Sequence, residues 1–442
     1  MLIEFKVQNY ASFNSEQTLS MLASSSTKED FNKKNTIVVD KFGVGNLLKV
    51  AALFGANSSG KTNLIDSLYA LKSIVLESLT TAEGNKLETI IPFLLKKDVF
   101  DIPTEFEVTF LHDKHLYRYG ISISQNIIEE EWLYWTKTSR ETMLFHRVGQ
   151  KIEINQRSFP EAKDFIKKDK DLFHIEKTRE TVPFISVLSQ FNGSKSRKVV
   201  DWFKKINIIS GIDEFVFKDY TIDLFEKNNE FKSWALNILA ALQIEDIKII
   251  EVEQNFPIEP PVNTSDEDLK NAIDALKKIV KKNKLKEKKV EVIKKVSDDD
   301  KTYSMPISFE SEGTRKLIYL LGPLFDTIKS GEILLIDEFD NKFHSLLSKY
   351  IINQCQQKNS PNSQLVITCH DTNLLSKELF RRDQIWFVEK NPKHESELYS
   401  LLEYKEHYTR KGNSYSKDYL TGKYGAIPLF KLFESLKEMI DG

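Results

Sequence analysis

Residues 55–62 carry glycine, lysine and threonine at a spacing that suits the binding of a nucleoside triphosphate. They read Gly-Ala-Asn-Ser-Ser-Gly-Lys-Thr, between an apolar run and a stretch with helical apolar spacing. Glycines let backbone N–H groups turn towards phosphates, and the positive end of the following helix dipole adds to the attraction. We expect Lys61 to neutralise the β- and γ-phosphates of ATP and the Thr62 hydroxyl to bind Mg²⁺. The expected phosphate contacts are Gly55, Asn57, Ser58, Ser59, Gly60, Lys61, Thr62 and Asn63.

Two adjacent acids follow the apolar run Ile-Leu-Leu-Ile at residues 333–336. A buried strand has no structural use for neighbouring carboxylates at its tip, so Asp337 and Glu338 are candidates for chemistry. Asp337 can hold Mg²⁺ through water, and Glu338 can orient and activate the water that attacks the γ-phosphate. A solvated strand end is the structural alternative, and the upstream phosphate motif makes it the weaker one.

His370 follows a third apolar run, residues 364–369. A lone His after a strand is more often structural, but its place one strand after the two acids favours a functional role. In that role it would reach the γ-phosphate and stabilise the charge that develops there during transfer. The predicted catalytic residues are therefore Lys61, Glu338 and His370. Gln190, which ends the run Ile-Ser-Val-Leu-Ser-Gln, is a further candidate ligand for Mg²⁺ beside Thr62 and Asp337.

The sequence Ser311-Glu-Gly313-Thr opens a helix that is expected directly before the two acids. Ser311 is a good capping residue for the first N–H groups of that helix. An exposed Ser and Gly at a helix N-terminus also make a site for a γ-phosphate that approaches from another subunit. Both interpretations can hold at once, so Ser311 and Gly313 stay candidate nucleotide contacts.

Periodicity places these motifs on alternating strands and helices. Short apolar runs or alternation predict strands, and apolar residues three or four apart predict helices. The expected strands are residues 2–7, 49–54, 332–336, 364–368 and 384–388, and the expected helices are 63–79, 312–329 and 343–357. Alternation between residues 90 and 160 predicts a separate antiparallel sheet. The expected fold class is α/β, a P-loop ATPase head with a mixed, largely parallel doubly wound sheet, an antiparallel β subdomain and a helical insertion.

The same pattern predicts four parts of the chain. Residues 1–160 form an N-terminal ATPase lobe with the phosphate motif and the antiparallel sheet, and 161–289 a mainly helical insertion with a lysine-rich projection. Residues 290–400 form a C-terminal lobe with Ser311, the acids and His370, and 401–442 a tail. No chemistry can be assigned to residues 419–428 of this tail, which we interpret as a docking segment.

The insertion ends in a lysine-dense segment. Residues 268–289 are expected to form a helix, and 290–309 a hairpin that turns at the three aspartates of 298–300. These aspartates are interpreted as solvated turn residues rather than a metal site. The lysines of 277–295 either bind DNA phosphates or an acidic trigger protein, or form a solvated helix face. Apolar residues at helical spacing among them favour a surface helix, which can also serve recognition.

The composition narrows the class of protein. The 442 residues are 40% hydrophobic, enough for the cores of two or three domains. A net charge of −2 gives no global attraction to nucleic acid, so DNA binding would need a local patch. Two cysteines, Cys355 and Cys369, can form neither a disulfide framework nor a zinc site. The sequence shows no signal-peptide pattern and no bilayer-spanning run, so we expect a cytoplasmic protein with no membrane partner.

The phosphate motif and the two acids lie unusually far apart in the sequence. Lys61 and Asp337 are 276 positions apart, far more than one βαβ unit needs. Together with the Ser-x-Gly helix before the acids and the His strand after them, this layout resembles the ABC-type ATPases of the SMC, RecF and OLD group. Residues 3–13 are similar to the opening strand and the Asn-aromatic-x-Ser-Phe turn of that group, except that Ala11 stands where a basic residue is often found. His344 stands where many members have the Asp of the D-loop.

Further segments are similar to the single-chain AAA/ABC ATPases of bacterial anti-phage defence operons, such as the PARIS, Septu, retron-associated and abortive-infection types. These segments are Glu-Ser-Glu-Gly-Thr-Arg at 310–315, Asp-Glu-Phe-Asp-Asn at 337–341, Arg-Asp-Gln-Ile-Trp-Phe-Val-Glu-Lys at 382–390 and residues 419–428. The resemblance covers nearly the whole chain outside the insertion. It implies an ABC-type head that uses ATP and Mg²⁺, with sites completed when two copies meet head to tail. It also implies an effector nuclease of TOPRIM or HNH type from the same operon, and a phage trigger protein.

Three functions stay open at this point. The first is an ATPase that senses infection and controls a separate effector in anti-phage defence. The second is a DNA-repair ATPase of the RecF or SMC type that clamps DNA when ATP is bound, although no coiled-coil arm of SMC size is present. The third is a scaffold that binds ATP with little turnover, against which Glu338 and His370 argue.

Overall fold

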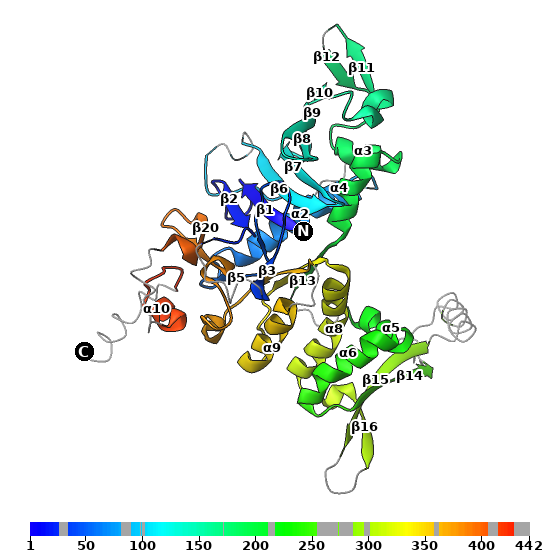
Figure 1. Ribbon diagram of the computed structural model, residues 1–442, viewed down its shortest axis with the longest axis vertical. Coiled ribbons are helices and arrows are strands. Elements are labelled where there is room, and N and C mark those ends of the chain that lie inside the picture. The colour runs from blue at the N-terminus through cyan, green and yellow to red at the C-terminus, as the bar shows by residue number, and fades with distance from the viewer. Residues whose placement is uncertain are drawn as a thin grey trace, which may run out of the picture. The chain divides into compact units, whose positions relative to one another are not determined.

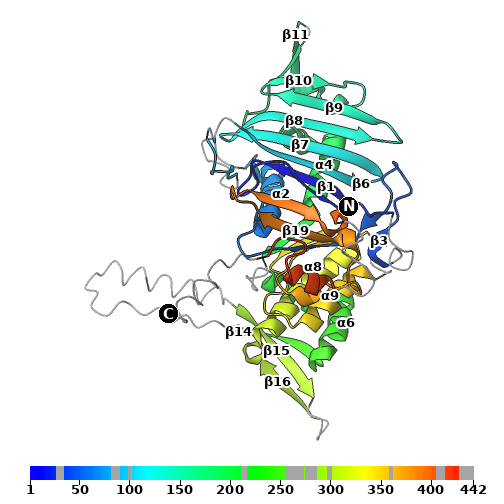
Figure 2. The same cartoon turned by 90° about the vertical axis from the view of Figure 1, so that its left-hand side faces the viewer.

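The computed structural model describes residues 1–25, 34–80, 90–97, 99, 102–170, 172–210, 217–253, 273, 286–295, 301–357, 362–404 and 414–427. The chain divides into two compact units (Figures 1 and 2). One unit combines Met1–Asp213 with Asp326–Gly442, and the other is Glu214–Phe325. Among the described residues, no helix has the length and apolar character needed to cross a membrane.

The first unit contains a nine-stranded antiparallel sheet, seen as a ladder of strands in Figure 2. Its order is β11-β12-β10-β9-β8-β7-β6-β1-β2. Phe106, Val108 and Phe110 of β6 are buried while the residues between them are partly exposed, so the alternation read from the sequence gives one face to the core. The strands are β1 (Leu2–Gln8), β2 (Gln17–Ser20), β6 (Thr104–His112), β7 (His115–Ser124), β8 (Ile127–Thr136), β9 (Glu141–Val148), β10 (Lys151–Ile154), β11 (Ile166–Asp169) and β12 (Leu172–Ile175).

A six-stranded sheet of the same unit carries the motifs. Its order is β13-β17-β18-β5-β19-β20, parallel except for β20 at the edge. Every residue of β5, β17 and β18 is buried, as in a parallel sheet covered on both faces. The strands are β5 (Val50–Phe54), β13 (Ile206–Ser210), β17 (Ile333–Asp337), β18 (Gln364–Thr368), β19 (Ile385–Lys390) and β20 (Ser396–Ser400). The mixed α/β fold class is confirmed.

Helix α2 (Lys61–Glu77) links the two sheets, because it contacts β1 of the first sheet and β13 and β17 of the second. Its buried face includes Leu64, Leu68 and Leu71, which lie in one apolar cluster with residues of both sheets. The described part of this unit also contains α3 (Phe184–Gln190), α4 (Ser194–Lys204), α9 (Ser345–Gln356), α10 (Tyr415–Leu420), the small pair β3 (Thr36–Ile37) and β4 (Leu47–Leu48), and short 3-10 turns.

The second unit combines helices with a three-stranded antiparallel sheet, β14-β15-β16. Helix α8 begins in it and continues into the first unit; Pro323 lies inside this helix and has no N–H to donate. The carbonyl of Tyr319, four residues earlier, instead accepts a hydrogen bond of 2.6 Å from the Thr221 hydroxyl. The elements are α5 (Lys218–Lys227), α6 (Asn229–Leu239), β14 (Asp246–Glu253), β15 (Lys286–Lys295), β16 (Thr302–Pro306) and α8 (Glu312–Ser330).

The insertion differs from the expected 161–289. Its first part continues the antiparallel sheet as β11 and β12, and the separate unit runs from Glu214 to Phe325. Strand β11 has four residues, three of them exposed, so it offers no apolar alternation to read.

The lysine-dense helix expected at 268–289 is wrong at its end, because residues 286–289 belong to β15 and pair with β14. The rest of that segment, apart from Ile273, lies outside the described residues, as does the turn at 298–300. The hairpin expected from residue 290 is confirmed as β15 and β16.

The described part of the tail packs against the parallel sheet. The rings of Tyr419 and Tyr424 stack on Phe387 of β19 at centroid distances of 5.5 and 5.6 Å. The Tyr399 hydroxyl of β20 donates to the Tyr424 carbonyl at 2.7 Å. Residues 414–427, which include nearly all of the segment 419–428 expected to serve docking, therefore belong to the core of the first unit. Residues 405–413 and 428–442 lie outside the described residues.

Candidate nucleotide-binding site

Strand order brings the predicted motifs together. Strand β18 lies between β17 and β5, and all three are parallel, so the segments that follow them meet at one edge of the sheet. A cavity of about 1010 Å³ opens there. Its lining residues are Asn57, Ser58, Ser59, Gly60, Lys61, Thr62, Asn63, Glu338, Asp340, Asn341, His370, Asp371 and Lys390.

The phosphate loop makes its turn only because two positions lack side chains. Gly60 has φ of +111°, and a Cβ there would lie 2.4 Å from Ser396 Oγ and 2.6 Å from Ser12 Oγ. A Cβ on Gly55 would lie 2.3 Å from the Val388 carbonyl oxygen. Both positions therefore require glycine for space as well as for conformation.

A buried polar network supports the loop from below. The Ser12 and Ser396 hydroxyl oxygens are 2.7 Å apart, and Asn63 Nδ2 donates to Ser12 Oγ at 2.7 Å. Ser396 Oγ also donates to the Ser59 carbonyl at 2.5 Å. The network ties the loop to the first turn of the chain and to β20. No signal in the sequence pointed to Ser396, since a serine at the start of an edge strand is ordinary.

Lys61 is buried beside the loop, with 5% of its surface exposed. Its ammonium donates to the carbonyls of Gly55 at 2.8 Å and Ala56 at 3.0 Å. Burial lowers the pKa of Lys61, and the nearby carboxylates of Asp337 and Asp340 act in the opposite direction. The cation is thus held at the loop in the place where phosphate oxygens could replace the carbonyls.

The two oxygens of Asp337 are each held by a hydroxyl. Thr62 Oγ1 donates to Oδ2 at 2.8 Å, and Thr368 Oγ1 donates to Oδ1 at 2.6 Å. A hydroxyl and a carboxylate in contact are the hard oxygen ligands that Mg²⁺ takes in phosphate sites, so Thr62 and Asp337 fit that ion. Among the described residues no group of three or more His, Cys, Asp and Glu could hold a metal by itself. The other ligands would have to be phosphate oxygens and water.

Glu338 turns the chain sharply at the end of β17. Its φ of +49° is uncommon for a residue with a side chain, and its amide donates to Thr368 Oγ1 at 2.7 Å. Asn341 Nδ2 donates to the Glu338 carboxylate at 3.3 Å. Thr368 therefore fixes both acids at once, and the strained turn is held at the wall of the cavity.

His370 reaches the cavity through a second turn. Its backbone N–H donates to Asp340 Oδ2 at 2.8 Å, and the amide of Asp371 donates to the same oxygen. Asp340 thus holds the segment after β18 against the segment after β17. The structure brings together Lys61, Thr62, Glu338 and His370 at one cavity, as predicted.

One protein family matches the sequence over residues 50–181 and 213–376, more than half of the chain. Its description is "AAA domain, putative AbiEii toxin, Type IV TA system". The chain belongs to this family. The matched stretches contain the phosphate loop, the two acids and His370, so the AAA domain of an ATPase family is assigned to the part of the chain that forms the cavity.

The family match stands beside weaker likenesses. No curated protein matches the sequence. The SMC head domain from Thermotoga maritima is 10% identical over 90% of this chain and 98% of that one, with a TM-score of 0.40. An SMC head bound to the C-winged helix domain of ScpA is 13% identical over 90% and 97%, with a TM-score of 0.43. An SMC head with an extended coiled coil, bound to the C-terminal domain of ScpA and derived from Pyrococcus furiosus, is 12% identical over 90% of this chain and 96% of that one, with a TM-score of 0.39. At these values the likeness does not extend to function or assembly.

Gln190 does not reach the cavity of this AAA domain, and its prediction as a Mg²⁺ ligand is wrong. It ends α3 and lines a separate hollow with Val75 and Leu76 of α2. Thr62 lies at the other end of α2, roughly 20 Å away at 1.5 Å per residue. Helix α3 is fixed there because the Ser186 hydroxyl donates to the Val75 carbonyl at 2.7 Å.

Ser311 caps α8, as one of its two interpretations predicted. Its hydroxyl accepts a hydrogen bond from the Thr314 amide at 3.1 Å and lies 2.9 Å from the Thr314 hydroxyl. Ser311 and Gly313 belong to the second unit, whereas the cavity belongs to the first. Their contact with a nucleotide therefore stays a prediction.

Several residues that line the cavity or support its acids are not among the predicted ones. Lys390 ends β19, the neighbour of the phosphate-loop strand, and Thr368 ends β18. Both stand at the edge where ligands bind in parallel sheets, so the topological rule would have found them once the strand order was known. Asp340 and Asn341 follow the two acids directly.

Proposed function

We propose that this chain binds ATP with Mg²⁺ in the cavity at the ends of β5, β17 and β18, and hydrolyses it. The observation that carries the proposal is the contact between Thr62 Oγ1 and Asp337 Oδ2 at 2.8 Å, which joins the phosphate loop to the acidic strand. A structural glycine turn would not need a hydroxyl and a carboxylate in that relation. The family's AAA domain is consistent with an ATPase.

Each side chain has a role in hydrolysis. Lys61 neutralises phosphate oxygens, and Thr62 and Asp337 hold Mg²⁺, which supplies positive charge beside the phosphates. Glu338 accepts a proton from the water whose oxygen forms a bond to the γ-phosphorus as the bond to the bridging oxygen breaks. His370 and Lys390 line the cavity and stabilise negative charge on the departing and transferred groups.

We also infer that the site is shared between two copies of the chain. Ser311 lies at the exposed start of α8, where backbone N–H groups and the helix dipole favour an anion. Gly313 leaves room for a phosphate near those groups. A γ-phosphate bound by one copy would meet Ser311 of the other in a head-to-tail dimer or a higher oligomer.

The biological role that we propose is a sensor and regulator in anti-phage defence. ATP-dependent assembly would hold or release a separate effector, a nuclease of TOPRIM or HNH type from the same operon, in response to a phage trigger protein. The family's description, which names an AbiEii toxin and a type IV toxin–antitoxin system, supports this role over a repair function.

The DNA-clamp alternative finds less support in the described lysines. Lys288 of β15 bonds to Asp223 and Glu226 at 2.6 and 2.5 Å, and Lys294 lies 2.7 Å from Glu310. Charges neutralised in this way attract phosphates weakly. Retention on DNA at low salt that depends on ATP and on these lysines would revive this alternative.

The test is mass photometry with and without ATP and Mg²⁺, together with phosphate release, for the wild type and Glu338→Gln. We expect nucleotide-dependent assembly in both, with phosphate release reduced about a hundredfold or more in the variant. Glu129→Gln, a change of the same kind at an exposed position of β8, is the control and should match the wild type. A Glu338→Gln variant that hydrolyses ATP normally would exclude the catalytic role. A chain that stays monomeric with ATP would exclude the shared site.

A further inference from the structure

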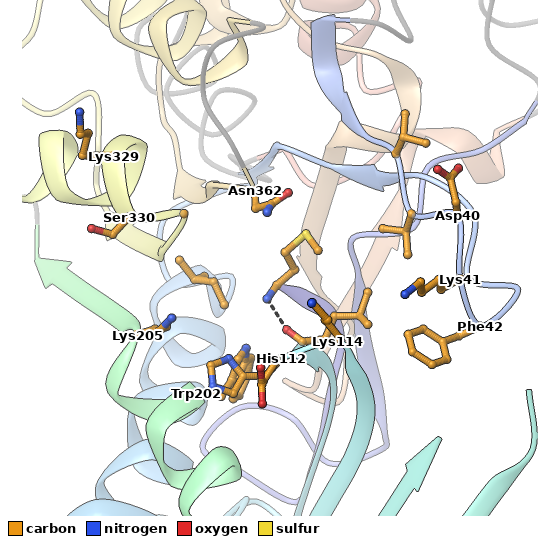
Figure 3. Close-up of a pocket in the computed structure, with 17 residues that line it drawn as sticks. Asp40, Lys41, Phe42, His112, Lys114, Trp202, Lys205, Lys329, Ser330 and Asn362 are labelled. Carbon is orange, nitrogen blue, oxygen red and sulfur yellow. Dashed lines mark hydrogen bonds between the residues drawn. The ribbon is translucent and has the colours of Figure 1, made fainter. Parts of the chain in front are cut away.

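A second cavity, of about 560 Å³, is shown in Figure 3. It lies at the N-terminal ends of β17 and β18, whereas the nucleotide cavity lies at their C-terminal ends. Ile333, the first residue of β17, and Asn362, just before β18, stand in its wall. The catalytic acids follow the other end of β17, so roughly 15 Å of strand separates the two sites. The rest of the wall comes from residues 38–42 after β3, the turn between β6 and β7, the end of α4 and the end of α8.

Positive charge dominates this cavity. Its wall carries four lysines, Lys41, Lys114, Lys205 and Lys329, against two acids, Asp40 and Asp113. The Asp113 carboxylate is already paired with Lys198 at 2.5 Å. For Lys41, Lys114 and Lys205, no carboxylate of the described part of the chain lies within ion-pair distance. Figure 3 shows Lys205, His112 and Trp202 grouped on one side, Lys41 and Phe42 on the other, and Lys114 between them.

The ionisation of His112 is consistent with a cavity whose wall carries positive charge. Burial, and then repulsion from Lys205, lower the pKa of His112 to about 4. Opposing contributions from Asp113 and Asp201 are smaller. The ring is therefore neutral at physiological pH and offers a nitrogen donor or acceptor rather than a further charge.

We propose that this cavity binds a small phosphorylated molecule. Several ammonium groups around one space match the two or more negative charges of a phosphate ester better than the single charge of a carboxylate. Val38, Phe42 and Leu111 provide apolar surface for the organic part of such a ligand. The volume lies within the range of small-molecule sites.

The position of the cavity connects a bound ligand to the nucleotide site through the chain segment between α8 and β17. Lys329, Ser330 and Gly331 of the wall join α8, which begins near Ser311, to β17, which carries Asp337 at its end. A ligand that fixes this connection would act on both ends of the proposed catalytic apparatus. This regulatory part rests on the proposed function, whereas the binding itself does not.

The binding test uses inorganic pyrophosphate and isothermal titration calorimetry. The Lys61→Ala variant removes the cation of the phosphate loop and leaves the second cavity intact, and we expect it still to bind pyrophosphate. Adding Lys114→Gln and Lys205→Gln should weaken that binding about tenfold or more, because each removes a charge-assisted contact. Lys204→Gln is the matched control: it changes a neighbouring lysine that pairs with Asp201 outside the cavity, and the affinity should not change.

Hydrogen exchange locates the site independently of affinity. Pyrophosphate should slow exchange at residues 38–42 and 111–114 in the Lys61→Ala variant, and less so after the two Gln substitutions. Loss of all pyrophosphate binding in Lys61→Ala would overturn the proposal, as would binding that ignores Lys114 and Lys205. Binding of citrate in place of pyrophosphate would overturn the phosphate assignment. Since no step measures ATP hydrolysis, failure here is distinct from failure of the proposed function.

Discussion

Thr62 Oγ1 donates a 2.8 Å hydrogen bond to Asp337 Oδ2, although the two residues are 275 positions apart. This contact exists because β18 is inserted between β17 and β5, which places the acidic strand one strand away from the phosphate-loop strand. Thr368 at the end of β18 completes the arrangement by holding the other oxygen of Asp337. The inserted strand thus positions both halves of the nucleotide site.

Replacing Thr368 by Val should impair hydrolysis with little effect on folding. Val keeps the shape of the side chain but removes its hydroxyl. That hydroxyl donates a hydrogen bond to Asp337 Oδ1 and accepts one from the Glu338 amide. Loss of hydrogen bonds to a charged group predicts a fall in phosphate release of about tenfold to a hundredfold. The concentration of Mg²⁺ that gives half the maximal rate should rise as well. Thr368→Ser retains the hydroxyl and should restore most of both quantities, and equal defects in Val and Ser variants would speak against this positioning role.

Replacing Gly60 by Ala should weaken ATP binding more than protein stability. The new Cβ would collide with Ser12 and Ser396 and displace the loop amides from the phosphates. Titration with a fluorescent ATP analogue should show about a tenfold or greater loss of affinity. Gly149→Ala is the control, because Gly149 also has positive φ but nothing within 4 Å of its added Cβ. Unchanged affinity in Gly60→Ala would contradict the packing described for the loop.

The stability of the chain should fall in mild acid partly because of His112. Its pKa in the folded state is about 4, below the value of 6.5 for an unfolded chain. As the pH falls through 6.5 the unfolded chain binds the proton first, so stability present above pH 7 is lost progressively down to about pH 4. Because the ring is partly exposed, we expect a contribution of about 1 kcal/mol rather than the full linkage value.

Urea unfolding at pH 7.5 and pH 5 checks this prediction. The difference in unfolding free energy between the two pH values should be smaller for His112→Gln than for the wild type. His115→Gln, on the other side of the same turn, serves for comparison. An identical pH dependence in wild type and His112→Gln would rule out the contribution of His112.

Removing the Thr221 hydroxyl should destabilise the second unit. Thr221→Val removes the buried 2.6 Å hydrogen bond that the Thr221 hydroxyl donates to the Tyr319 carbonyl, four residues before Pro323. The loss of one buried hydrogen bond costs about 0.5 to 1.5 kcal/mol. Hydrogen exchange in α8 around residues 317–321 should become faster, while exchange in β5 and β18 should not. Thr221→Ser keeps the donor and should behave as the wild type. Unchanged hydrogen-exchange protection of α8 in Thr221→Val would contradict the stabilising role of the Thr221 hydroxyl.

The features that the sequence predicts correctly are those that depend on interactions between residues close together in the chain. Glycine at 55 and 60, the apolar runs ending in Asp337 and His370, and the cap at Ser311 depend on neighbouring residues, so the sequence alone determined the phosphate loop, the acidic strand and the helices around them. The alternation around Phe106 and Tyr117 likewise determined an antiparallel sheet, since period two is a property of the strand itself.

Contacts between distant residues were decided by the tertiary structure. The sequence could not show that Ser396 supports the phosphate loop, that Thr368 holds Asp337, or that Lys390 lines the cavity, because each depends on the order of strands in the sheet. The same dependence explains the error at Gln190, whose motif is local but whose position is set by the packing of α3 on the far end of α2. Strand order is set by the packing free energy of the whole core, so it cannot be read from any short stretch of the sequence.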